Sequence, residues 1–87
     1  MPFDAIIWDL DDDPDGNVQH CAEHDVTKEE VEEVFENATD ADISRSSGRP
    51  VVIGDTTAGR HLMVVFDEID DDTVYPVTAF EVPRRRR

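Results

Sequence analysis

The sequence has little positive charge. Of its 87 residues, 22 are acidic and only 8 are lysine or arginine, so the formal net charge at pH 7 is -14. Lys28 is the only lysine, and four of the arginines form the terminal run at residues 84–87. A surface of this sign repels the phosphate backbone of nucleic acids and attracts cations and basic proteins.

Cysteine and long apolar runs are also scarce. Cys21 is the only cysteine, which excludes a disulfide within the chain and favours a reducing compartment. The longest apolar runs are too short for a signal peptide or a membrane span. We therefore expect a cytoplasmic protein with no membrane partner.

Length and patterning predict one small domain. Hydrophobic residues make up 38% of the chain, but they fall in blocks, which is typical of a folded domain. A chain of 87 residues buries only a thin core and leaves little room for a large enzyme scaffold. We expect a single domain at residues 1–83, followed by a disordered basic tail at residues 84–87.

The first half of the chain predicts one strand and two helices. The apolar segment at residues 3–10 has β-branched and aromatic residues typical of a strand, and a turn follows it. A short helix is expected at residues 17–23. "TKEE" predicts a capping box between Thr27 and Glu30 that opens a second helix, which ends at Asn37.

The second half predicts a hairpin and a last strand. Residues 39–50 are typical of a loop with, at most, a short strand around Ile43. Strands are expected at 50–55 and 60–68, joined by a turn, and a final strand at 73–82. Pro76 cannot donate to a strand ladder and predicts an edge or a bulge there.

These elements predict an α+β domain of order β-α-α-β-β-β. Two helices would pack on one face of a small antiparallel sheet. Apolar spacing predicts the core residues, and Trp8 is expected in the core or at an interface. The predicted core comprises Val31, Val34, Phe35, Leu62, Val64 and Phe66.

The aspartates of "DLDDDPDG" raise the question of a metal site. Asp11, Asp13, Asp15 and Gly16 match the start of a calcium-binding EF-hand loop, but Ala22 stands where that loop needs a bidentate glutamate. The preceding segment is also strand-like, where an EF-hand has a helix. We interpret the cluster as a solvated turn near a helix N-terminus, with weak cation binding as the alternative.

Asp9 supports a second hypothesis. An apolar strand ending in Asp9-x-Asp11 resembles the first motif of haloacid dehalogenase-like hydrolases, which would make Asp9 a nucleophile and Asp11 an acid/base near magnesium. The family's Gly-Thr after the second aspartate is missing, and no βαβ alternation follows. We instead expect Asp9 to be half-buried and to orient a neighbouring side chain.

A third hypothesis covers residues 6–82, which resemble the BrnT family of toxins. "WD" at 8–9 matches the family's opening Trp-Asp pair. Asn17 then precedes "EHDVTKEEVEEVF", which is similar to the family's Lys-His-Gly-Val-Ser/Thr-x-Glu-Glu stretch. "AGRHLMVVF" is similar to its Gly-Arg-x-Leu-x-Val-Val strand, and "YPVTAFEV" takes the place of its Ile-Ser-Ala-Arg-Lys strand.

The BrnT resemblance implies a RelE-like fold and the toxin role in a type II toxin–antitoxin pair. Such a toxin is a metal-independent ribonuclease with no cofactor. The implied partner is a basic ribbon-helix-helix antitoxin, RNA is the implied substrate, and a homodimer or a heterotetramer is the implied assembly.

Several positions depart from the family pattern. Phe80 and Glu81 stand where its final strand has arginine and lysine, and Glu23 and Asp25 flank the histidine in place of lysine and glycine. A metal-independent ribonuclease needs a base, an acid and cations that stabilise the charged phosphorane. Phe80 and Glu81 supply no cation, so we expect the activity to be weak or lost.

Three residues are the candidates for catalysis. His24 aligns with the family's histidine and Arg60 with its arginine, whereas Tyr75 on the last strand is placed to position a phosphate. Each has a structural alternative. His24 would pack at a helix end, Arg60 would be a solvated hairpin end, and Tyr75 would be a core residue.

Other basic residues are candidate contacts. Arg45, Arg49 and His61 would contact RNA or another anion, with an ordinary polar surface as the alternative. His20 and His24 share a helical face, but no third ligand is fixed beside them, so no metal site is predicted.

Two functions therefore remain open. The chain is either a toxin-like ribonuclease held inactive by its antitoxin, or a non-catalytic acidic module on the same fold that binds a basic protein.

Overall fold

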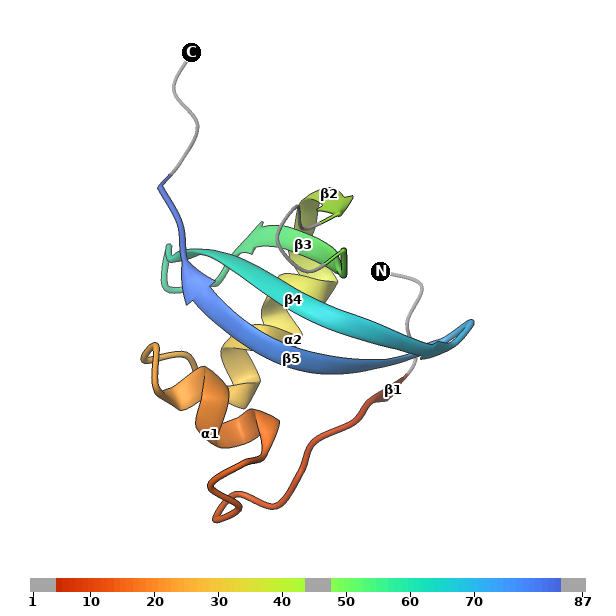
Figure 1. Ribbon diagram of the computed structural model, residues 1–87. Coiled ribbons are helices and arrows are strands. Elements are labelled where there is room, and N and C mark those ends of the chain that lie inside the picture. The colour runs from red at the N-terminus through yellow and green to blue at the C-terminus, as the bar shows by residue number, and fades with distance from the viewer. Residues whose placement is uncertain (1–4, 44–47, 84–87) are drawn as a thin grey trace.

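The computed structural model describes residues 5–43 and 48–83. Arg45 and the tail at residues 84–87 lie outside the described residues. Helices and strands are both present, so the predicted α+β class is confirmed (Figure 1). The elements in chain order are β1 (Ala5–Ile6), α1 (Asn17–Ala22), α2 (Lys28–Asn37), β2 (Ala38–Ile43), β3 (Pro50–Asp55), β4 (His61–Asp70) and β5 (Thr73–Glu81).

The sheet has the strand order β1-β5-β4-β3-β2. Strands β2 to β5 form an antiparallel meander, whereas β1 pairs parallel to β5. The prediction of an antiparallel sheet therefore needs correction, because the sheet is mixed. The long segment from β1 to β5 carries both helices, and such a crossover is what permits a parallel pair.

Strand β2 is a second correction. The sequence predicted a loop with at most a short strand near Ile43, but β2 starts directly after Asn37 and pairs with β3 from Pro50 to Gly54. Two aspartates and two alanines give this segment little intrinsic strand propensity. Its conformation therefore depends on pairing with β3, which the local sequence does not show.

The irregularity predicted at Pro76 is confirmed. Val65 pairs with Thr78 and Phe66 pairs with Pro76, so Val77 is the extra residue of a bulge in β5. A bulge reverses which residues face each side of the sheet. Thr78 and Phe80 therefore share the side of Val65 and Met63, while Ala79 faces the core.

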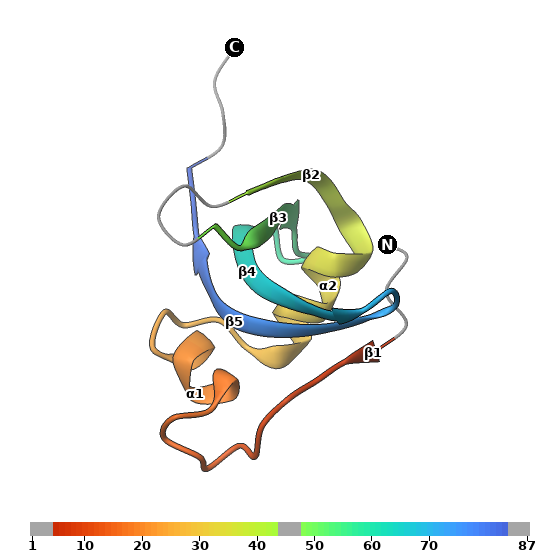
Figure 2. The same ribbon diagram turned by 45° about the vertical axis from the view of Figure 1, so that its right-hand side comes forward.

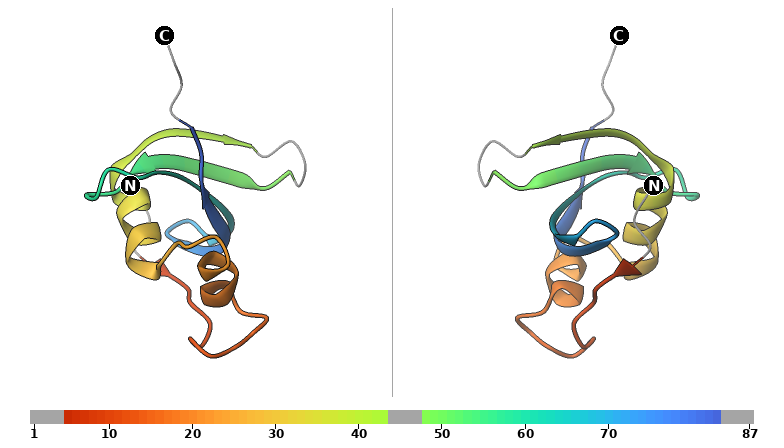
Figure 3. Two further views of the ribbon diagram at one scale, coloured as in Figure 1. Left: turned by 90° about the vertical axis from the view of Figure 1, so that its left-hand side faces the viewer. Right: turned by 90° about the vertical axis from the view of Figure 1, so that its right-hand side faces the viewer.

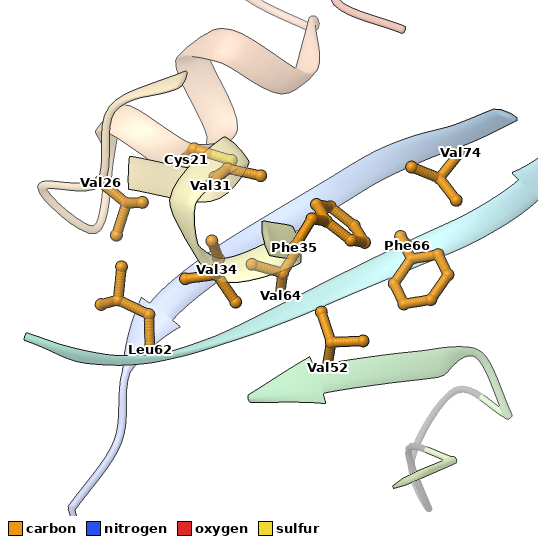
Figure 4. Packing of buried hydrophobic residues seen from close by; sticks show 11 residues of the cluster. Cys21, Val26, Val31, Val34, Phe35, Val52, Leu62, Val64, Phe66 and Val74 are labelled. Carbon is orange, nitrogen blue, oxygen red and sulfur yellow. The ribbon is translucent and has the colours of Figure 1, made fainter. Parts of the chain in front are cut away.

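Both helices lie on one side of the curved sheet, as predicted (Figures 2 and 3). The side chains between them form a single apolar cluster, in which the rings of Phe35 and Phe66 meet edge to face at 5.2 Å (Figure 4). All six predicted core residues are at most 3% exposed. Trp8 packs against the cluster and donates from Nε1 to Glu32.

The turn between the helices holds them at a fixed angle. Asp25 has a left-handed φ of 61°. Its amide donates to the carbonyl of Ala22, and the next amide, of Val26, donates to the carbonyl of Cys21. This pair of bonds is a Schellman motif, which usually has glycine at the left-handed position. Val26 and Cys21 are both buried, which completes the motif.

The predicted capping box is present at the start of α2. The hydroxyl of Thr27 accepts from the amide of Glu30, and the Glu30 carboxylate accepts from the amide of Thr27. No helix among the described residues is long and apolar enough to cross a membrane.

Candidate functional site

Arg60 lies in a network of carboxylates. Its Nη1 donates to both carboxylate oxygens of Glu30 at 2.9 Å and to the carbonyl of Asp25 at 2.7 Å, and its Nη2 lies 3.5 Å from Glu81. The hydrogen bonds that Arg60 donates to Glu30 raise the pKa of Arg60 above its usual value, so the guanidinium stays charged. Arg60 thus joins the α1–α2 turn and α2 to the ends of β4 and β5.

His24 lies beside this network. Its ring is exposed, and its centroid is 5.9 Å from that of Phe80 on β5. Because Arg60 contacts the next residue of the turn, Asp25, the structure brings two of the predicted catalytic residues to one end of the sheet. The residues around them are aromatic or acidic, as Phe80 and Glu81 show.

Tyr75 belongs to a different network. Its hydroxyl donates to Oδ2 of Asp9 at 2.5 Å, and the same oxygen accepts from the amide of Asn17 at 3.0 Å. These hydrogen bonds lower the pKa of Asp9 and raise the pKa of Tyr75 to about 12. At neutral pH the pair is an ionised carboxylate and a protonated phenol. The expectation that Asp9 orients a neighbour fits this contact.

Asn17 closes this network, although the sequence placed it only within the BrnT resemblance and not among the candidate site residues. Its side chain is buried, with Oδ1 accepting from the amide of Asp9 and Nδ2 donating to the carbonyls of Ile7 and Pro76, all at 2.9 Å. It therefore ties the segment after β1 to α1 and to β5. The only local signal was its place between the "WD" block and the helix.

Glycine is required at position 16 because its backbone lies close to the side chain of Asp9. A Cβ at this position would lie 2.7 Å from Cβ of Asp9, which is closer than side-chain carbons approach in folded proteins. The loop at residues 9–17 is therefore folded back tightly onto itself, and the Asp9–Asn17 bonds hold it there.

The described lysine and arginines all have carboxylate partners. Lys28 pairs with Asp11 at 2.9 Å, Arg49 pairs with Asp67 at 2.9 Å, and Arg60 pairs as above. A phosphate would have to displace a carboxylate to reach any of them. Nδ1 of His61, a predicted anion contact, lies 2.7 Å from Asp55.

The aspartate loop contains polar contacts within the chain. Oδ1 of Asp13 accepts from the amide of Asp15, and Asp11 is held by Lys28. Within residues 5–43 and 48–83, no group of three or more histidine, cysteine, aspartate or glutamate side chains is arranged to hold a metal ion. The loop is exposed, in agreement with the interpretation as a solvated turn.

Comparison with protein-family models, with curated proteins and with solved structures finds no match to this chain. The geometry alone therefore has to guide the functional argument. It divides the candidate residues between two networks, with His24 and Arg60 at one end of β5 and Tyr75 with Asp9 near the other. No common site for a reacting phosphate is built from the three.

Proposed function

We propose that this chain is a diverged BrnT-like toxin component with a RelE-like fold, whose main activity is to bind a basic protein. Ribonuclease activity in this proposal is weak or lost. The observation that carries the proposal is the pairing of Arg60 with Glu30 and Glu81, because Arg60 is the arginine that the resemblance makes a catalytic candidate.

The BrnT resemblance is supported by what its motif residues do. "HDVT" forms the turn between the helices, with Asp25 at the left-handed position where the family has glycine. Thr27 and Glu30 form the capping box at the family's Ser/Thr-x-Glu-Glu. Asp9 and Asn17, from the first blocks, bond to each other. The quoted motifs therefore supply the turn between the helices, the cap of α2 and the bonds that hold the first segment, which supports reading them as parts of one fold.

The electrostatics argue against RNA as the main ligand. Phosphate binding gains its free energy from lysine and arginine, and a contact with Lys28, Arg49 or Arg60 would first break an existing ion pair. A net charge of -14 adds a general repulsion that is strongest at low ionic strength. The same charge steers a basic protein towards this chain and raises its association rate.

The toxin role and the interaction module differ in their consequences for a cell. Controlled expression in bacteria, with growth and RNA integrity followed over time, tests catalysis. We expect intact RNA from the wild type and the same result from His24→Ala. The proposal would be refuted if the wild type cleaves RNA and His24→Ala or Arg60→Ala abolishes the cleavage. That result would favour the ribonuclease hypothesis.

Binding is tested with the product of a short reading frame that adjoins the gene. We expect a basic protein with a ribbon-helix-helix pattern that forms a complex with this chain, and an affinity that falls as salt is raised. If no such neighbour exists, or if the two proteins do not associate at low salt, the toxin–antitoxin assignment is wrong. If no such neighbouring reading frame exists, the chain is better described as a non-catalytic interaction module.

The loss of catalysis has its own test. Phe80→Arg with Glu81→Lys restores the two cations of the family's last strand. Glu68→Arg with Ile69→Lys, at exposed positions of β4, changes the net charge by the same amount elsewhere. We expect RNA cleavage only in the first double variant. Equal cleavage by both would show that overall charge alone is responsible.

A further inference from the structure

The side of the sheet away from the helices carries an apolar strip. In the register of β4 and β5, Met63 lies opposite Phe80, and Val65 lies opposite Thr78. Ile53 and Val51 extend the same two rows onto β3. We call the four β4–β5 residues the outer strip; they are all half-buried.

No helix or strand among residues 5–43 and 48–83 lies over this side of the sheet, since both helices contribute to the core on the other side (Figure 3). Antiparallel sheets with one solvated face normally place polar residues there. Three of the four residues of the outer strip are instead large and apolar. A contiguous apolar face rimmed by polar groups is typical of an interaction site.

Carboxylates border the strip at both ends. Asp55 is in the row beyond Ile53, and its side chain is 43% exposed. Asp67 is in the row beyond Val65, and its side chain is 45% exposed. An apolar centre with an acidic rim fits a ligand that is apolar along one line and cationic beside it.

We propose that the outer strip is the docking surface for an amphipathic, lysine- or arginine-rich segment of the basic protein partner. This inference rests on the proposed function and specifies where the partner binds. The apolar line of the segment covers Met63, Val65 and Phe80. Its cations compete with His61 for Asp55 and with Arg49 for Asp67, which are ion pairs within the chain. Burial of apolar area supplies the affinity, and the charges set the orientation.

A second copy of this chain fits the strip poorly. Two copies would each bring a charge of -14 to the contact, and their acidic rims would face each other. A basic segment removes this repulsion and pairs with the rim. The charge of the chain therefore selects a cationic partner over self-association.

The test uses a synthetic amphipathic peptide of leucine and lysine with its leucines on one helical face. A matched peptide has serine in place of leucine and keeps the same charge. Binding to the full chain is measured by calorimetry, and the contact residues are mapped by amide chemical shifts. We expect the leucine peptide to bind with shifts centred on β4 and β5, and the serine peptide to bind at least about tenfold more weakly.

Variants locate the site. Met63→Ser with Phe80→Ser should lower the affinity for the leucine peptide by about tenfold or more. Thr78→Lys should also lower this affinity, because it places a cation in the strip without removing an apolar side chain. Leu10→Ser with Ile69→Ser is the matched control, since these residues are 75% and 55% exposed outside the strip, and should bind like the wild type. Amide spectra of each variant check that the fold is retained.

Two results would overturn the inference and leave the proposed function standing. One is equal binding of the leucine and serine peptides, and the other is tight binding with shifts confined to the acidic face of α2. Absence of binding by both peptides at low salt would overturn the inference and the basic-partner function together. Dimers in ultracentrifugation that Thr78→Lys disrupts would assign the strip to a second copy instead.

Discussion

Replacement of Asn17 by alanine should be among the most destabilising single changes in this chain. The side chain is 2% exposed and makes three hydrogen bonds, of which the one to the carbonyl of Pro76 is buried. An unsatisfied buried carbonyl costs about 1–3 kcal/mol, and the two part-buried partners, Ile7 and Asp9, add about 0.5–1 kcal/mol each. We expect Asn17→Ala to lower the free energy of unfolding by about 2–5 kcal/mol.

Urea denaturation followed by circular dichroism measures this change. Asn37→Ala is the matched control, because Asn37 is an exposed helix-end asparagine with one long contact of 3.5 Å, and it should cost about 0.5 kcal/mol or less. Asn17→Asp keeps the acceptor for Asp9 but places a carboxylate against two carbonyls. It should be more destabilising than alanine at pH 7, with partial recovery as the pH falls and the carboxyl group is protonated. Equal midpoints for the Asn17 and Asn37 alanine variants would refute the reasoning.

Two further substitutions, a tyrosine titration and a thiol-labelling experiment test the local structure. Asp25→Gly should raise the free energy of unfolding by about 0.5–1 kcal/mol, since glycine adopts the left-handed φ without the Cβ penalty; a lower melting temperature would contradict this. The lowered pKa of Asp9 gives stability that is present above its unfolded pKa of 3.8 and is lost as the pH falls through the folded pKa. Because the hydrogen bond from Tyr75 is the main cause of the lowered pKa, Tyr75→Phe should make the melting temperature fall less steeply at acid pH. Absorbance of the one tyrosine should titrate near pH 12. The stability that its raised pKa supplies is fully present below pH 10 and is lost as the pH rises from 10 through about 12. Burial raises the pKa of Cys21 to about 11, so a thiol reagent at pH 8 should react slowly with the native chain and rapidly in urea; fast native labelling would show that α1 opens readily.

The elements that the sequence predicted are those with local causes. The capping box at Thr27 and the apolar spacing of Val31, Val34 and Phe35 are properties of neighbouring residues. The hairpin of β3 and β4 and the bulge beside Pro76 likewise depend on short-range turn and backbone chemistry. Local sequence determined these features, so they could be predicted without knowledge of the tertiary contacts.

The elements that the sequence did not predict depend on distant partners. Strand β2 is formed by pairing with β3, and the parallel pair of β1 and β5 joins residues separated by both helices. Tyr75 meets Asp9 across 66 positions of the chain, and Arg60 meets Glu30 across 30. Neither pair has a periodicity or spacing that marks it, so a catalytic role for Arg60 or Tyr75 could not be weighed before the structure placed their partners.

The residues that carry the BrnT resemblance are mainly residues that hold the chain together. Asp9 and Asn17 fasten the first segment, Asp25 sets the angle between the helices, and Arg60 joins that turn to β4 and β5 through Glu30. A side chain that already satisfies its charge or its hydrogen bonds within the fold has little left to offer a substrate. A family member that kept these contacts but lost the arginine and lysine of the last strand would keep its fold and its protein partner and lose its ribonuclease activity. The face that remains free to change with function is then the outer side of β4 and β5, where no contact of the core constrains it.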